Sequence, residues 1–125
     1  MALSPKTLAR GIAAGRLALG LAMVAAPGRA TGAWLGDVAD TPGGHVAVRA
    51  LGIRDAILGA ITLHTLEHPE VGPRWVATCG VADLVDCAAT VAARDGLPRQ
   101  YPAMIAVAGG AAAASFALAG ALKRA

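Results

Sequence analysis

Aromatic residues and charges are both scarce in this 125-residue chain. Phe, Tyr and Trp make up 3% of the residues and Asp, Glu, Lys and Arg make up 15%, whereas 56% are hydrophobic. A water-soluble core would therefore have to be built almost entirely from Ala, Val, Leu and Ile, which is unusual for a soluble domain of this length. A lipid bilayer explains the hydrophobic excess more simply, and a soluble alanine-rich helical bundle is the alternative.

A basic cluster and a disulfide framework are missing as well. The 11 Lys and Arg residues are scattered among the termini, the linkers and the apolar segments, without the aromatic and basic interleaving of a nucleic-acid surface. Cys79 and Cys87 would lie roughly 12 Å apart along one helix, too far for a disulfide with each other. The sequence therefore predicts no nucleic-acid partner, and the cysteines do not identify a redox compartment.

Four hydrophobic segments divide the chain, each near the roughly 20 residues that a bilayer helix needs. They cover residues 7–26, 46–66, 74–93 and 103–122, and Pro or Gly stands at or near every boundary. The sequence thus predicts an all-α protein with one domain over residues 1–125. We expect an up-and-down antiparallel bundle of four transmembrane helices, with residues 27–45 as its longest linker.

The distribution of bases predicts the topology. An even number of spans puts both termini on one side, and that side carries more Lys and Arg than the other, which favours cytoplasmic termini. The first side holds Lys6, Arg10, Arg74, Lys123 and Arg124, and the second holds Arg29, Arg94 and Arg99. We expect a multi-pass protein of the inner (plasma) membrane whose first segment is not a cleaved signal peptide, because Arg16 interrupts its apolar run.

Charges inside the hydrophobic segments are the main candidate site. Arg16, Arg54 and Asp83 lie roughly 12 to 15 Å along their helices, near the middle of a bilayer core about 30 Å thick. A lone charge there costs roughly 2.5 to 3.5 kcal/mol, so such residues usually face one another or a polar cavity. The predicted intramembrane network contains three cations and three anions, namely Arg16, Arg49, Arg54, Asp55, Asp83 and Asp86.

Helical spacing predicts how these charges are arranged. Asp83 and Asp86 are three residues apart and share one face. Arg54 points about 100° away from Asp55, so that the second segment can contact two neighbouring helices. A balanced network can fix helix register without any ligand, whereas a polar cavity beside it would bind a headgroup or pass protons.

The run His64-Thr65-Leu66-Glu67-His68 matches the H-x-x-E-H pattern of zinc peptidases. A peptidase also needs a third ligand and a substrate cleft, for which a chain this short has little room. His64 and His68 are therefore only weak metal candidates, and interfacial polar caps are the alternative. No catalytic residue and no cofactor is predicted.

Several short motifs carry a family resemblance. The segments Gly15-Arg16-Leu17-Ala18-Leu19-Gly20, Trp34-Leu35-Gly36 and Arg49-Ala50-Leu51-Gly52-Ile53-Arg54-Asp55 resemble small four-helix bacterial membrane proteins of unknown function, and more remotely the DoxX-like group. The resemblance covers most of the chain up to Asp86. It implies an integral membrane four-helix bundle and supplies no established activity.

The sequence thus predicts a small, non-enzymatic membrane protein with a structural or accessory role. A transporter or proton-relay component that uses the intramembrane carboxylates is one alternative, and an accessory subunit of a membrane oxidoreductase is another. The expected partners are the lipid bilayer and either a second copy of the chain or another membrane protein.

Overall fold

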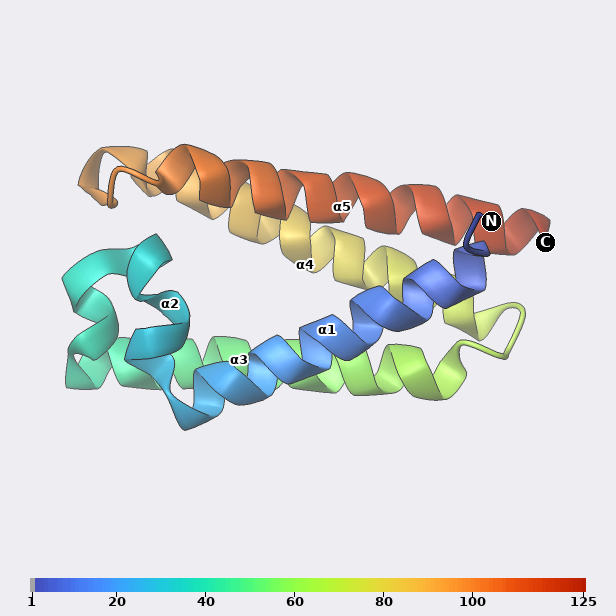
Figure 1. Ribbon diagram of the computed structural model, residues 1–125, viewed down its shortest axis with the longest axis horizontal. Coiled ribbons are helices and arrows are strands. Elements are labelled where there is room, and N and C mark those ends of the chain that lie inside the picture. The colour runs from blue at the N-terminus through green and yellow to red at the C-terminus, as the bar shows by residue number, and fades with distance from the viewer. Residues whose placement is uncertain (1) are drawn as a thin grey trace.

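The chain is almost entirely helical over residues 2–125, the part that the computed structural model describes (Figure 1). Two short 3-10 turns, η1 (Gly36–Asp40) and η2 (Arg94–Gly96), follow the second and fourth helices, and no strand occurs in this range. The all-α prediction is therefore confirmed. The five helices are α1 (Pro5–Ala25), α2 (Pro27–Leu35), α3 (Pro42–Thr65), α4 (Val71–Ala93) and α5 (Tyr101–Arg124).

Local sequence signals explain where the helices begin. Pro5, Pro27 and Pro42 occupy the first positions of α1, α2 and α3, where the missing N–H would have no intrahelical partner anyway. The Ser4 and Thr41 hydroxyls accept hydrogen bonds from backbone N–H groups three residues further on, at 3.1 and 3.0 Å. These caps fix the entry into α1 and α3.

The prediction for the first linker is wrong in part. Residues 27–35 form α2 and residues 36–40 form η1, so that α3 begins at Pro42 rather than near residue 46. Gly36 separates the two elements with a φ of 72°, a backbone conformation that favours glycine. Helix α4 also begins earlier than predicted, at Val71 rather than 74, because Pro73 lies in its first turn, where proline is tolerated.

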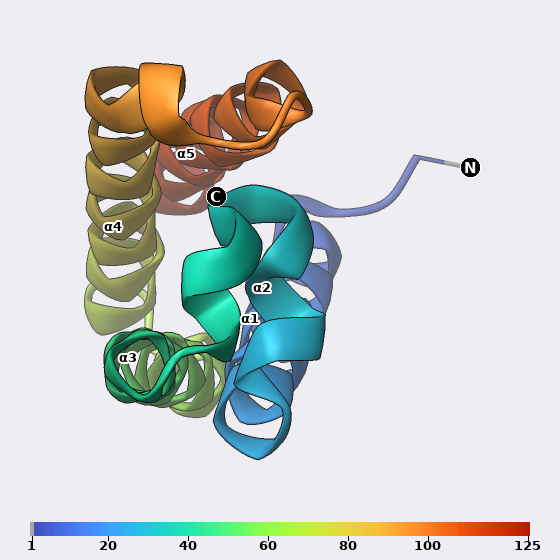
Figure 2. The ribbon, with the colours of Figure 1, turned by 90° about the vertical axis from the view of Figure 1, so that its left-hand side faces the viewer.

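The four long helices form two antiparallel pairs. Helix α1 packs mainly on α3 and α4 mainly on α5, and the two pairs meet less extensively. In Figure 1 the N-terminus, the C-terminus and the α3–α4 turn lie at one end of the molecule, and α2 lies at the other. The end-on view shows α2 between the two pairs (Figure 2). The chain therefore runs up and down through α1, α3, α4 and α5.

Glycine allows α1 and α3 to approach closely. A Cβ on Gly52 would lie 2.7 Å from the carbonyl oxygen of Gly20, and a Cβ on Gly59 would lie 2.7 Å from the carbonyl oxygen of Ala13. These contacts are with backbone atoms, which cannot rotate away as a side chain can. The α1–α3 pair is thus a small-residue interface of the kind that membrane helices use.

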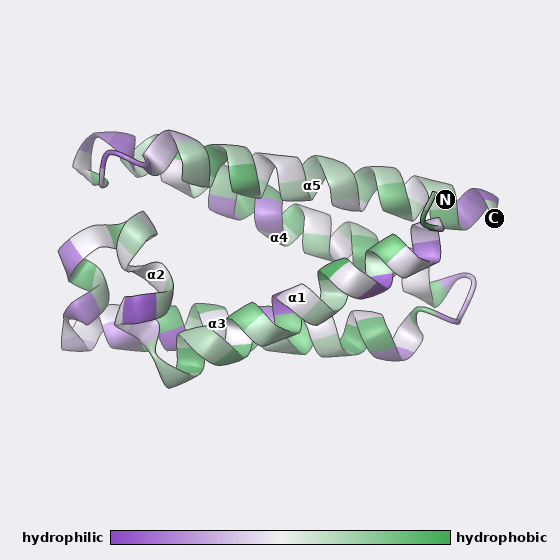
Figure 3. Cartoon of the chain, viewed as in Figure 1, coloured by the Kyte–Doolittle hydropathy of each residue, from purple (hydrophilic) through white to green (hydrophobic). Residues whose placement is uncertain are grey.

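The distribution of polarity is the reverse of that in a soluble bundle. Large apolar side chains on all four long helices are exposed, among them Leu19, Val46, Val85 and Val107. The buried set contains many small and polar residues, including Asp55. In Figure 3 most residues of the long helices are coloured as hydrophobic or neutral, and hydrophilic residues gather mainly at the ends of the molecule and near the middle of α4. A lipid environment would cover such an outer surface.

Three helical segments are long and apolar enough to cross a membrane: Pro5–Ala25, Val71–Gly96 and Tyr101–Arg124. Helix α3 has 24 residues but is not among them. Any 18-residue stretch of α3 contains all of Arg49, Arg54 and Asp55, and so has too many charges to count as an apolar span. The structure thus supports a membrane protein with three such segments. By length and composition, three of the four predicted spans qualify, and the fourth, α3, does not.

Candidate functional site

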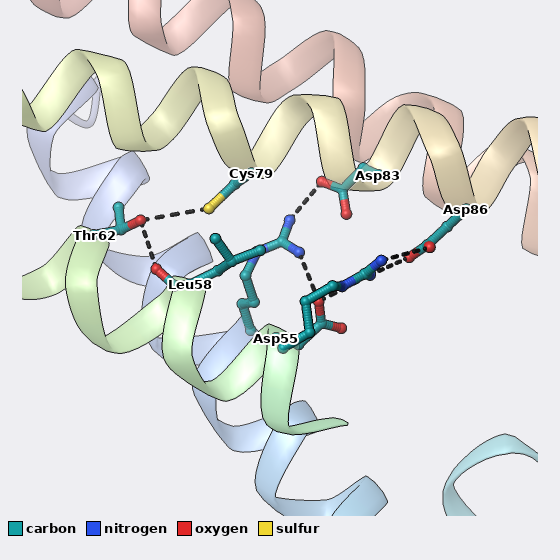
Figure 4. Close-up of polar contacts among 8 residues, drawn as sticks. Asp55, Leu58, Thr62, Cys79, Asp83 and Asp86 are labelled. Carbon is teal, nitrogen blue, oxygen red and sulfur yellow. Dashed lines mark hydrogen bonds and ion pairs between the residues drawn. The ribbon is translucent and has the colours of Figure 1, made fainter. Parts of the chain in front are cut away.

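The centre of the molecule holds an ion-pair network that joins α1, α3 and α4. Arg16 of α1 donates a hydrogen bond from Nη1 to Asp55 Oδ1 of α3 at 3.2 Å. Its Nη2 donates to Asp83 Oδ2 of α4 at 2.5 Å. Figure 4 shows Asp55 and Asp83 pointing into the space between these helices. One guanidinium therefore links three helices at once.

A second guanidinium joins α3 to α4. Arg54 makes a bidentate pair with Asp86, with Nη1 3.1 Å from Oδ1 and Nη2 2.8 Å from Oδ2. The same Nη2 donates to Asp55 Oδ1 at 3.1 Å. Planar bidentate pairs of this type fix geometry as well as charge. Asp55 Oδ1 thus accepts from both arginines and connects the two halves of the network.

Exposure differs between the two ends of the network. The Arg16 side chain is 8% exposed, and its partners Asp55 and Asp83 are 9% and 10% exposed. The Arg54 and Asp86 side chains are 33% and 19% exposed. The network therefore has a buried end at Arg16 and a more open end at Arg54.

Arg49 does not join these ion pairs. Its Nε donates to the backbone carbonyl oxygen of Val24 at 3.0 Å, and the residue is exposed. Arg49 lies near the N-terminal end of α3, more than a turn away from Arg54, so that its long side chain reaches the end of α1 instead. The predicted balance of three cations and three anions consequently fails, because two guanidiniums face three carboxylates.

A small cavity borders the buried end of the network. It has a volume of about 10 Å³ and is lined by residues of four helices, including Arg16, Thr62, Cys79 and Ser115. This space is enough for about one water molecule. Thr62 donates to the backbone carbonyl oxygen of Leu58 at 2.7 Å, and its hydroxyl lies 3.4 Å from the Cys79 sulfur (Figure 4). No organic ligand fits in this cavity.

Sequence reasoning missed the polar contact that joins α2 to α4. The Trp34 indole N–H donates to the Thr90 hydroxyl at 3.0 Å, and Thr90 in turn donates to the backbone carbonyl oxygen of Asp86 at 2.7 Å. Trp34 lies in the segment 27–45, which the sequence predicts as a linker. The four-residue spacing between Asp86 and Thr90 was the available signal, because it places both on one face of α4.

The H-x-x-E-H residues have other partners. Glu67 accepts hydrogen bonds from Lys6 at 3.1 Å and from Arg10 at 2.5 Å. His68 Nδ1 accepts the backbone N–H groups of Glu70 and Val71, at 3.3 and 3.2 Å, and so caps the start of α4. His64 is exposed. Within residues 2–125 no three His, Cys, Asp or Glu side chains converge on a metal position.

The contact of Glu67, in the α3–α4 turn, with Lys6 and Arg10 of α1 depends on pH. The hydrogen bond from Lys6, helped by Arg10, lowers the pKa of this carboxyl below its usual range. Its contribution is therefore complete above the ordinary Glu pKa and is lost as the pH falls through the lowered value. We expect acidification to loosen the start of α1, and amide hydrogen exchange of its first turns should show lower protection relative to the intrinsic rate at the same pH. The effect should be small, because the Glu67 side chain is 67% exposed.

Glu67→Gln provides the control for this effect. The variant should show the low protection already at neutral pH, and acidification should not lower its protection further. Equal pH dependence in the variant and the unmodified chain would assign the effect to another group.

These features define a helical protein of membrane type, with an ion-pair network at the centre of its long helices. No family model, curated protein or solved structure matches this chain. Its function must therefore be argued from the network itself.

Proposed function

We propose that this chain is an integral membrane protein with four spans, in which α3 is the fourth. We further propose a non-catalytic, structural or accessory role in the inner (plasma) membrane, with both termini in the cytoplasm. The network of Arg16, Arg54, Asp55, Asp83 and Asp86 serves as an internal lock between the two helix pairs. The resemblance to four-helix, DoxX-like membrane proteins agrees with this proposal and adds no activity to it.

The case for α3 as a span rests on its length and its partners. Its 24 residues extend about 36 Å, which exceeds the roughly 30 Å of a bilayer core. It lies antiparallel to α1 along a glycine interface. Its central charges, Arg54 and Asp55, pair with α1 and α4 rather than facing lipid alone. Pairing of this kind is how membrane proteins accommodate ionised side chains at depth.

The observation that carries the structural role is the direct pairing of both guanidiniums across helices. Arg16 and Arg54 each bind carboxylates of another helix at 3.2 Å or less. The cavity beside Arg16 holds only about one water molecule. Ionic groups arranged in this way select one helix register, since a shifted register would leave charges unpaired in an apolar surrounding.

Topology is the direct test of the four-span proposal. Reporter fusions at the N-terminus and after Ala125, assayed in intact cells, should both show a cytoplasmic location. The reason is that four spans return the chain to its starting side, and the bases near the termini favour the inner side. A third reporter inserted at Gly96 should lie on the opposite face.

Three spans would place the termini on opposite sides of the membrane. That result would place α3 outside the membrane, and its charged residues would then not pair in the apolar part of the bilayer. Such an outcome would contradict the proposal, whichever side each terminus occupied.

A second candidate is a transporter or proton-relay component, and one observation favours it: the carboxylates outnumber the guanidiniums. The variant Arg54→Met with Asp86→Leu separates the two candidates. A structural lock should survive this exchange, because a buried ion pair and an apolar pair of similar volume are often equally stabilising. A proton relay should lose proton movement, measured with a pH-sensitive dye in vesicles, while the protein still folds.

A further inference from the structure

We propose that the central network binds one exchangeable proton, which Asp55 and Asp83 share around Arg16. This inference rests on the proposed four-span arrangement, since it requires the network to lie in the apolar part of the membrane. It goes beyond a structural lock, because it assigns a ligand and a stoichiometry to the site.

The first step is the charge of the network. Helix α1 contributes Arg16, α3 contributes Arg54 and Asp55, and α4 contributes Asp83 and Asp86. Two positive and three negative groups leave a formal charge of −1. An uncompensated charge in an apolar surrounding is costly, and an acid in that position takes up a proton instead.

The other cation of α3, Arg49, is exposed, donates to the Val24 carbonyl oxygen and forms no ion pair within residues 2–125. Helix α5 has no ionisable side chain between Pro102 and Leu122. The neighbouring Cys79 thiol lies beside the Thr62 hydroxyl and adds no positive charge. The charged residues of α2 and η1 are all exposed and form no ion pair with the network within residues 2–125, namely Arg29, Asp37 and Asp40.

The second step is the position of the proton. Both oxygens of Asp86 accept from Arg54. Asp55 uses only Oδ1, and Asp83 uses only Oδ2. A proton on Asp83 Oδ1 therefore breaks no hydrogen bond, and it leaves each guanidinium with a full carboxylate: Arg16 with Asp55, and Arg54 with Asp86. The same proton on Asp55 Oδ2 breaks no hydrogen bond either and leaves Arg16 paired with Asp83, so both positions are open to it.

The third step is the choice of a proton over a metal ion. Within residues 2–125 no three acidic, Cys or His side chains converge closely enough to hold a metal. The free oxygens also lie beside guanidiniums, which repel a cation. A proton needs only one oxygen.

Infrared spectroscopy of the full chain in lipid vesicles tests the proposal. At pH 7 the unmodified protein should show the carbonyl stretching band of one protonated carboxyl group, and the band should shift in D₂O because the proton exchanges. Asp55→Asn, Asp83→Asn and Asp86→Asn each leave two acids for two arginines, so each should abolish the band. Arg54→Gln leaves three acids for one arginine and should increase the band about twofold. Asp37→Asn, outside the network, should leave it unchanged.

Two results would overturn the proposal. The first is the absence of a protonated-carboxyl band, or of its D₂O shift, in the unmodified protein, which does not depend on how any variant folds. The second is loss of the band in only one of the three Asp→Asn variants, because this would show an isolated buried acid instead of a shared proton. Reporter topology is measured independently, so a failure of the four-span proposal is recognised separately.

Discussion

Arg16→Met is expected to lower the free energy of unfolding by about 3 to 5 kcal/mol, the range for removing one partner of a buried ion pair. Arg16 is 8% exposed and contacts carboxylates on two other helices. Methionine fills a similar volume but leaves Asp83 without a partner and Asp55 with only Arg54. Unfolding in mixed micelles, followed by circular dichroism as the fraction of denaturing detergent rises, measures the change.

Two further variants give this experiment its contrast. Arg49→Met removes a guanidinium from the same hydrophobic region, but Arg49 is exposed and bonds only to a backbone carbonyl, so the cost should stay within about 0.5 kcal/mol. Arg16→Met combined with Asp83→Leu removes both charges and should recover much of the lost stability. Equal destabilisation by Arg16→Met and Arg49→Met would contradict the central position of Arg16.

Gly59→Ala is expected to destabilise the α1–α3 pair by about 1 to 3 kcal/mol, the usual cost of adding atoms to a filled interface. The added Cβ would lie 2.7 Å from both the Ala13 carbonyl oxygen and the Leu17 backbone nitrogen. Relief requires α1 and α3 to move apart, which would also lengthen the contact between Arg16 and Asp55. The same detergent titration measures the loss of stability.

Gly11→Ala is the matched control, because it makes the same change on the neighbouring helix. A Cβ at Gly11 meets nothing within 4 Å. Alanine is also the better helix former, so this variant should be neutral or more stable, by up to about 1 kcal/mol. Comparable losses at Gly11 and Gly59 would show that the effect comes from the helix backbone rather than from the α1–α3 contact.

The sequence was sufficient to predict the long helices and part of the site. Proline and glycine positions placed their boundaries within a few residues, because these signals act locally. The offset of about 100° between Arg54 and Asp55 predicted that α3 would contact two neighbouring helices. In the structure Asp55 binds Arg16 of α1, and Arg54 binds Asp86 of α4.

Features that depend on tertiary contact were not predictable in the same way. Gly11 and Gly15 have the four-residue spacing that is typical of packed membrane helices, yet a Cβ at either would meet nothing within 4 Å. The pattern does not reveal which face of α1 meets α3. Helix α2 was missed because nine residues that include Gly28 and Gly32 give a weak helical signal, and its contact through Trp34 is with a distant segment.

The two helix pairs divide the central charges unequally, and this division has a consequence for biosynthesis. Helices α1 and α3 carry Arg16, Arg54 and Asp55, whereas Asp83 and Asp86 both lie on α4. Of the network charges, the α1–α3 pair carries two positive and one negative, and the α4–α5 pair carries only the two negative ones. In the proposed four-span arrangement neither pair has balanced network charges by itself, so we expect stable insertion of α1 and α3 to require α4.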